Sequence, residues 1–245
     1  MSERSVLAVI IGRAGSKGLP GKNALALLGR AMVCHTIEDA QAARRVDRVI
    51  VSTDGEAIAE AARSMGVSVV DRPAALADDH ATVDAAVRHA VETDGGGEET
   101  IVILYANVPV RPDDLIDRAV DRLVESGADS VQSYCDVGKY HPCWTSTVDD
   151  DGRVELREPN AFYRRQDLPP AVIPDGGVIA VTRGSLFTVV EGEPHAFLGE
   201  DRRSIITPRG AVIDVDSEID LALAETVLRR AHRGTVRLAV PEECR

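Results

Sequence analysis

The chain has 245 residues, of which 44% are hydrophobic and 28% charged, a composition typical of globular proteins that argues against a disordered or fibrous one. Forty acidic residues outnumber 28 basic ones, and the formal net charge of −12 argues against a nucleic-acid partner. A chain of this size buries roughly 70–75% of its unfolded surface, so we expect one α/β domain with an insert that needs neither disulfides nor a structural metal.

Apolar runs of strand length alternate with segments of helical period along the chain, a pattern that indicates βαβ units and a mainly parallel sheet. Strands are predicted at residues 6–11, 49–52, 67–70, 101–105, 129–134, 178–181 and 212–215. Helices are predicted at residues 57–65, 83–91 and 112–123, and from Ser217 towards Gly234. Ser217 followed by Asp220 is a helix-capping pattern at the start of the last helix. Gly127 is expected to end the helix predicted at 112–123.

The segment 136–175 interrupts this rhythm. It holds five of the 12 prolines and shows no long amphipathic helix, and it gathers Tyr140, Trp144, Phe162 and Tyr163 just before Arg164 and Arg165. We therefore divide the chain into one domain made of residues 1–135 and 176–245 and an inserted subdomain at 136–175. Aromatic and arginine side chains are enriched at interfaces, so we expect the insert to make a dimer contact. The alternative is a flap that covers the chain's own sheet.

No apolar run reaches the roughly 18 residues that a bilayer span requires, and the first five residues lack a secretory signal. We expect a cytoplasmic protein with no membrane partner. The four cysteines show no C-x-x-C spacing, so we expect reduced thiols at Cys34, Cys135, Cys143 and Cys244. A metal site formed by Cys135, Asp136, His141 and Cys143 stays open as an alternative to a packed loop.

The strongest chemical signal is the run G-R-A-G-S-K-G-L-P-G-K-N at residues 12–23, directly after the first predicted strand. Glycines let the backbone approach an anion, and Arg13, Lys17 and Lys22 can neutralise a triphosphate. The run is neither a Walker A loop, which needs G-K-[ST], nor a dinucleotide loop, which needs G-x-G-x-x-G. The alternative to a phosphate loop is a solvated glycine-rich turn.

Five segments of the chain, in the order in which the family has them, resemble the acylneuraminate cytidylyltransferases, or CMP-sialic acid synthetases. This family is related to the CMP-Kdo synthetases. The loop 12–23 resembles the family's nucleotide-binding signature, and its closing Lys-Asn is typical of the sialic-acid branch. The other four segments are S-T-D at 52–54, R-P with L-A and Thr82 at 72–82, R-Q-D-L-P-P at 165–170 and I-D-V-D at 213–216.

The resemblance implies a Rossmann-like nucleotidyltransferase fold, with a mainly parallel sheet, helices on both faces and a protruding dimerisation subdomain. It implies a homodimer that joins CTP to a 2-keto sugar acid, sialic acid or a related nonulosonate, and releases pyrophosphate. The implied catalytic residues are Arg13, Lys17 and Lys22. The implied nucleotide-binding residues are Gly12, Arg13, Ala14, Gly15, Ser16, Lys17, Lys22, Asn23 and Thr82. The implied substrate-binding residues are Tyr105, Asn107, Arg165, Gln166 and Asp175.

The metal implied is Mg²⁺, held by Asp214 and Asp216. These residues lie two apart on a strand-like segment, so both side chains can face one cation. The alternative is a strand end that caps the following helix.

The sequence departs from the family pattern where the sugar is expected. Tyr105 replaces a glutamine in a segment usually close to L-Q-P-T-S-P-L-R, although Pro109 and Arg111 keep their places. Asp175 stands where an asparagine is usual, and Ile179 where a tyrosine is usual. Two alternatives therefore stay open: the same fold acting on Kdo or another sugar acceptor, and a catalytically silent nucleotide-binding protein.

Overall fold

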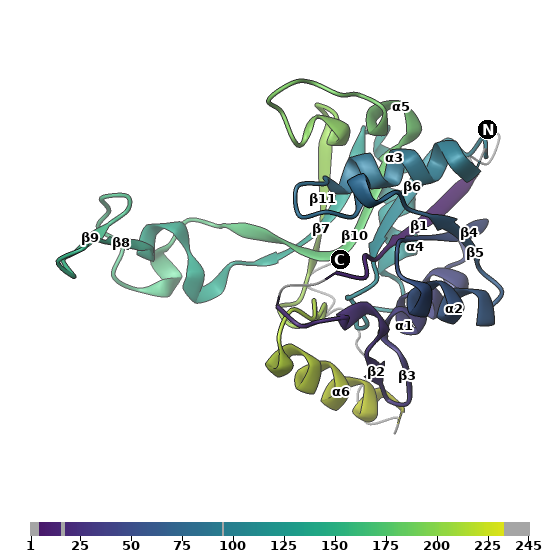
Figure 1. Ribbon diagram of the computed structural model, residues 1–245. Helices are drawn as coiled ribbons and strands as arrows, with labels where there is room; N and C mark the ends of the chain where they lie inside the picture. The colour runs from purple at the N-terminus through teal and green to yellow at the C-terminus, as the bar shows by residue number, and fades with distance from the viewer. Residues whose placement is uncertain (1–4, 16–17, 95, 233–245) are drawn as a thin grey trace.

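The computed structural model describes residues 5–15, 18–94 and 96–232. Its longer strands are β1 (Val6–Ile11), β4 (Arg48–Thr53), β5 (Ser68–Asp71), β6 (Thr100–Tyr105), β7 (Ser130–Asp136), β10 (Val172–Thr182) and β11 (Arg202–Thr207). In the described part of the chain these seven form one sheet in the order β11-β7-β10-β6-β1-β4-β5 (Figure 1). Only β10 runs antiparallel to its neighbours, so the predicted mainly parallel sheet is confirmed.

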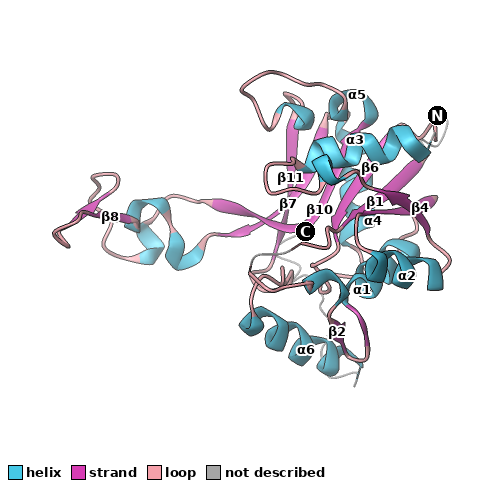
Figure 2. Ribbon diagram, in the orientation of Figure 1, coloured by secondary structure: helices cyan, strands magenta, loops and turns pink. Residues whose placement is uncertain are grey.

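Helices cover both faces of this sheet (Figure 2). They are α1 (Met32–Ala42), α2 (Glu56–Ser64), α3 (Val83–Asp94), α4 (Leu115–Ser126), the short α5 (Arg183–Leu186) and α6 (Glu218–His232). Alternate residues of β1 belong to two different cores, because Ala8 and Ile10 pack with α1, α2 and α4, and Leu7 and Val9 pack with α3. The strand is therefore apolar throughout, as expected of a strand buried on both faces.

A third, smaller core joins α6 to the hairpin of β2 (Ala26–Leu27) and β3 (Arg30–Ala31). The predicted cap of α6 is confirmed: the Ser217 backbone N–H donates to the Asp220 carboxylate over 2.9 Å, and the Asp220 N–H donates back to the Ser217 hydroxyl over 3.3 Å. The end of α4 is confirmed too, since Gly127 has the left-handed φ of 67° that a glycine stop provides.

One predicted strand was wrong, and one strand of the main sheet was not predicted. Residues 212–215 form no strand, and a single antiparallel bridge joins Ile213 to Val110. The strand β11 was missed because its first three residues, Arg202, Arg203 and Ser204, are exposed at the sheet edge and give no apolar run.

Residues 136–175 extend away from the sheet as an arm, which contradicts the alternative of a flap over the chain's own sheet (Figure 1). The arm begins where β7 and β10 leave the body as a paired ribbon, with Val172 opposite Asp136. It carries the small hairpin of β8 (Ser146–Val148) and β9 (Val154–Leu156).

No helix within the described residues is long and apolar enough to cross a bilayer.

The guanidinium of Arg111 is buried where α1, β10 and the segment after β6 meet. It donates to the Asp39 carboxylate of α1 over 2.7 Å, to the Gly177 carbonyl of β10 over 3.2 Å and to the Val108 carbonyl over 2.8 Å. Burial lowers the pKa of Arg111 and the charge of Asp39 opposes that shift, so the guanidinium stays charged.

We predict that Arg111→Met lowers the free energy of unfolding by about 3 kcal/mol, because it removes a charged donor from the Asp39 carboxylate and the Gly177 carbonyl and leaves the Val108 carbonyl with the Thr36 hydroxyl as its donor. Urea unfolding followed by circular dichroism measures this change. The matched control is Arg122→Met on the exposed side of α4, which should change stability by less than about 0.5 kcal/mol. Equal losses in the two variants would contradict the role of Arg111.

Candidate functional site

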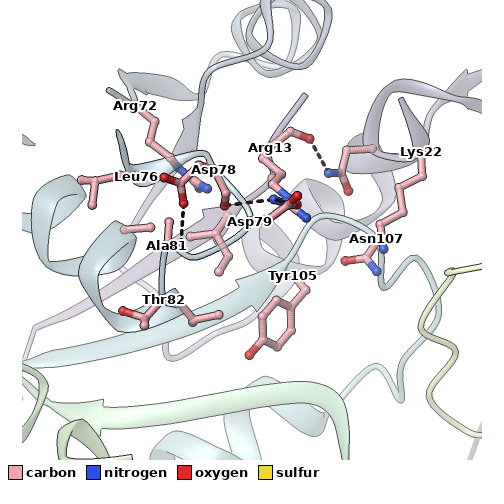
Figure 3. Close-up of a pocket in the computed structure, with 15 residues that line it drawn as sticks. Arg13, Lys22, Arg72, Leu76, Asp78, Asp79, Ala81, Thr82, Tyr105 and Asn107 are labelled. Atoms are coloured by element: carbon pink, nitrogen blue, oxygen red, sulfur yellow. Dashed lines mark hydrogen bonds and ion pairs between the residues drawn. The ribbon is translucent and has the colours of Figure 1, made fainter. Parts of the chain in front are cut away.

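The candidate site is a cavity of about 270 Å³ beside the carboxyl ends of β1 and β6, where open α/β sheets bind ligands. Its lining combines phosphate-loop residues with residues from the segments after β5 and β6. They are Ile11, Gly12, Arg13, Lys22, Asn23, Arg72, Leu76, Asp78, Asp79, Ala81, Thr82, Val83, Ala86, Tyr105 and Asn107. In Figure 3, Lys22 and Asn107 lie at one end and Leu76 and Thr82 at the other, with Arg13 and Tyr105 between them.

The start of the phosphate loop requires a glycine. A Cβ on Gly12 would lie 2.7 Å from the Cβ of Ala106, so any side chain would push the loop away from the end of β6. The amide of Asn23 donates to the Arg13 carbonyl over 2.9 Å and ties the end of the loop to its beginning. The other side-chain atom of Asn23, Oδ1, is buried and has no hydrogen-bond partner among the described residues.

Two cations of the loop line the cavity, and each contacts a carboxylate. Arg13 donates to the Asp79 carboxylate over 2.8 Å and to the Asp78 carbonyl over 3.0 Å (Figure 3). Lys22 forms an ion pair with Asp216. The third predicted cation, Lys17, lies outside the described residues, as does Ser16.

The other predicted nucleotide-binding residues fall into two groups. Gly12, Asn23 and Thr82 line the cavity together with Arg13 and Lys22. Ala14 and Gly15 are exposed beyond its lining, and the backbone N–H of Ala14 donates to the Asp54 carboxylate over 2.8 Å.

Asp214 and Asp216 lie on the exposed side of their segment. The residues that alternate with them, Ile213 and Val215, are buried in the third core, which contains α6. The amide of Asn107 donates to the Asp214 carboxylate and to the Val215 carbonyl, and the Val215 N–H donates back to the Asn107 carbonyl over 2.9 Å. Asn107 therefore fixes the segment that carries both carboxylates.

Electrostatics at this pair disfavour two bare negative charges. Partial loss of hydration, and then the charge of Asp216, raise the pKa of Asp214 to about 6, while Lys22 opposes the shift. Burial, and then the charge of Asp214, raise the pKa of Tyr105, so its hydroxyl stays protonated.

The donor set fits Mg²⁺. This ion binds through one or two carboxylates together with substrate phosphates and waters. Asp214 and Asp216 supply two carboxylates, and the cavity that would hold phosphates begins at Lys22 and Asn107. No cluster of three or more His, Cys, Asp or Glu side chains suited to a metal occurs in the described ranges.

The structure decides between the alternatives for the cysteine-containing loop. His141 accepts a hydrogen bond from the Cys143 N–H over 3.1 Å at Nδ1, and its Nε2 lies 3.0 Å from the Pro169 carbonyl. Both ring nitrogens are thus engaged by the backbone, and the packed-loop interpretation holds. Cys34, Cys135 and Cys143 are free thiols, and Cys244 lies outside the described residues.

Three predicted substrate-binding residues lie outside the cavity lining. Asp175 accepts hydrogen bonds from the hydroxyls of Ser133 and Thr207 and from the Gly177 N–H, so its carboxylate points into the sheet. Arg165 and Gln166 lie in the exposed turn Arg165–Asp167 of the arm, where Arg165 pairs with Asp136 over 3.3 Å. Figure 1 shows this arm directed away from the chain's own sheet.

Arg72 belongs to the R-P segment of the sequence, which did not predict a role for it in the site. Its buried guanidinium donates to the Ser52 carbonyl over 2.6 Å and to the Ser52 hydroxyl over 3.2 Å, and it lines the cavity. Burial lowers the pKa of Arg72, and the charge of Asp54 opposes this shift.

Sequence reasoning also missed a second cavity of about 410 Å³, which shares Thr82, Val83 and Tyr105 with the first. Its other lining residues are Asp84, Gln132, Tyr134, Pro174, Ile179, Pro194, His195, Phe197, Leu198 and Arg202. No motif marks this cavity, because its residues come from α3, four strands and the loop that follows α5.

Comparison with solved structures supports the fold. The structure resembles CMP-2-keto-3-deoxy-manno-octonic acid synthetase in complex with CTP, with a TM-score of 0.72 and 17% identity over 93% of this chain and 99% of that one. It also resembles 4-diphosphocytidyl-2C-methyl-D-erythritol synthase from Anaerococcus prevotii, with a TM-score of 0.64 and 12% identity over 94% and 100% of the two chains.

Sequence relatives are closer. An N-acylneuraminate cytidylyltransferase of Streptococcus agalactiae is 34% identical over 70% of this chain and 42% of its own length. The chain thus spans less than half of that relative. A CMP-N,N'-diacetyllegionaminic acid synthase of Legionella pneumophila is 30% identical over 91% of this chain and 96% of its own length, and a pseudaminic acid cytidylyltransferase of Campylobacter jejuni is 25% identical over 93% and 98%.

The family model described as Cytidylyltransferase matches residues 7–172, which include the phosphate loop, both segments after β5 and β6 and most of the arm. The chain therefore belongs to the cytidylyltransferase family.

Proposed function

We propose that the chain catalyses the transfer of the cytidylyl group of CTP to a 2-keto sugar acid of the nonulosonate type, with release of pyrophosphate. The observation that carries this proposal is the placement of a cationic glycine-rich loop beside a pair of carboxylates at the mouth of one cavity. The names of relatives that span the whole chain, legionaminic and pseudaminic acid transferases, support the acceptor class.

The nucleotide would lie along the first cavity. Leu76, Val83 and Ala86 form apolar walls suited to a base, and the unpaired Oδ1 of Asn23 is free to accept a hydrogen bond from a ribose hydroxyl or a base amine. Arg13 and Lys22, which line the same cavity, would bind the triphosphate. The family resemblance implies the same role for Lys17.

We assign Mg²⁺ to Asp214 and Asp216. When bound, the ion would neutralise charge on the triphosphate and polarise a phosphoryl oxygen. The protein's side chains would orient the reacting groups. The amide of Asn107 donates to the Asp214 carboxylate and holds it in place, and Tyr105, with its neutral hydroxyl, lies between the two cavities.

The sugar acid would occupy the second cavity, next to Tyr105. Its anomeric hydroxyl would lose its proton to a water molecule as the oxygen attacks the α-phosphorus of CTP and the bond to the β-phosphate oxygen breaks. The cations of the loop would stabilise the charge on the departing pyrophosphate. We place the protein in the cytoplasm, where CTP is made.

We further propose a homodimer in which the arm of one chain reaches the site of the other. The arm exposes Tyr163 at 93% and Tyr140 at 64%, together with Val148, Val154 and Leu156, and a gathering of exposed apolar side chains is typical of an interaction surface. Arg165 and Gln166 lie on this arm and away from the chain's own cavity, so a role in sugar binding requires a second subunit.

The function is tested by pyrophosphate release with CTP, Mg²⁺ and a panel of acceptors that contains sialic, legionaminic and pseudaminic acids and Kdo. We expect turnover with a nonulosonate, and Asp216→Asn should lower it roughly 10²-fold or more because the metal loses one of its two carboxylates. Glu60→Gln on the exposed face of α2 is the charge-matched control and should leave turnover unchanged. Absence of turnover with every acceptor would favour the silent nucleotide-binding alternative.

The shared site is tested by mixing two weakly active variants, Asp216→Asn in the body and Arg165→Ala in the arm. If the arm acts on the partner's site, mixed dimers contain one site with an intact body and an intact arm, and activity should recover to roughly a quarter of wild type. If Arg165 acts within its own chain, mixing restores nothing. Light scattering on the wild type should give twice the monomer mass, and a fully active monomer would contradict the dimer.

A further inference from the structure

Lys22 serves two anions in this site. Its ammonium pairs with Asp216, and the same side chain lines the cavity assigned to the triphosphate. Asp216 is also one of the two carboxylates assigned to Mg²⁺. One ammonium group cannot interact at full strength with Asp216 and with a phosphate oxygen at the same time. A contact between Lys22 and Asp216 therefore weakens the contact between Lys22 and the phosphate, and the reverse also holds.

The two carboxylates of the metal pair differ in the partner that holds them. Asp214 is held by the neutral amide of Asn107, which can keep its hydrogen bond to one oxygen while the other binds a cation. Asp216 is held by a cation, and a divalent ion on that carboxylate would repel the ammonium. Lysine is suited to the exchange because its charge sits on a flexible four-carbon chain.

We propose that the Lys22–Asp216 pair makes the site select the metal complex of the nucleotide over the metal-free nucleotide. With Mg²⁺ held by Asp216, the Lys22 ammonium would leave this carboxylate and would bind the triphosphate. A nucleotide without metal meets a lysine that is already neutralised and a carboxylate that repels it. This inference rests on the proposed binding of CTP and Mg²⁺, and goes beyond it by giving the pair a role in selectivity.

A second ion pair of the cavity provides a matched control. Arg13 pairs with Asp79, which is as exposed as a typical surface carboxylate and has no part in the metal site. Asp79→Asn removes one negative charge near the phosphates, as Asp216→Asn does. General repulsion would therefore act in both variants, whereas exchange with a metal concerns Asp216 alone.

The experiment is calorimetric titration of CTP, without a sugar acid, in EDTA and in Mg²⁺. The variants are Asp216→Asn, Asp79→Asn, Lys22→Met and the double variant with Lys22→Met and Asp216→Asn. Thermal unfolding confirms that each variant is folded. Asp216 lies largely in solvent, so the effect of its ion pair should be that of a surface pair, roughly two- to fivefold in affinity.

We expect Asp216→Asn to bind metal-free CTP roughly two- to fivefold more tightly than wild type and to bind CTP in Mg²⁺ more weakly, so its effect changes sign between the two conditions. Asp79→Asn should change both affinities in the same direction. In the Lys22→Met background, Asp216→Asn should give no gain in EDTA beyond that of Asp79→Asn, because there is no ammonium to release.

The inference is overturned if Asp216→Asn binds metal-free CTP no more tightly than wild type does, or if its gain is as large in the Lys22→Met background. Tight binding of CTP to wild type in Mg²⁺ together with either result would leave the proposed function intact and remove only the selectivity role. Failure of wild type to bind CTP in Mg²⁺ would overturn the proposed function, and this inference with it.

Discussion

The position of the candidate site depends on one buried guanidinium. Arg111 ties the segment after β6 to α1 through Asp39 and to β10 through the Gly177 carbonyl. The same segment carries Asn107, which holds the carboxylate of Asp214. The Asp214–Asp216 pair, although more than 100 residues away in sequence, is therefore positioned by the packing of a single charged side chain among three elements. The desolvation cost of burying that charge is offset only because all of these partners are present.

The proposed ligand is strongly anionic, whereas the protein has a net charge of −12, so the candidate site must provide a local environment that differs from the rest of the surface. The structure meets this constraint with paired charges rather than with an excess of positive charge. Arg13 contacts Asp79 and Lys22 contacts Asp216, so carboxylates neutralise both cations. Partial loss of hydration, and then the charge of Asp216, raise the pKa of Asp214 to about 6, and a divalent cation would favour its ionised form.

Sequence reasoning succeeded where the physical signal is local. The strand 6–11 was predictable because burial on both faces requires an unbroken apolar run, and the cap at Ser217 because its partner lies three residues away. It failed for β11, whose exposed edge position leaves no apolar pattern. It also could not orient Asp175, because the hydroxyls that turn this carboxylate into the sheet come from two other strands. Long-range contacts of this kind leave no trace in residue spacing.

The central claim is that the phosphate loop and the Asp214–Asp216 pair form one site for CTP and a divalent cation. A crystal structure of the protein with CTP and Mn²⁺, whose anomalous scattering identifies the ion, tests it most directly. The account predicts the triphosphate along residues 12–23, Mn²⁺ between the phosphates and both carboxylates, and Lys22 on a phosphate oxygen instead of on Asp216. Mn²⁺ bound away from both carboxylates, or CTP bound outside the cavity, would contradict it.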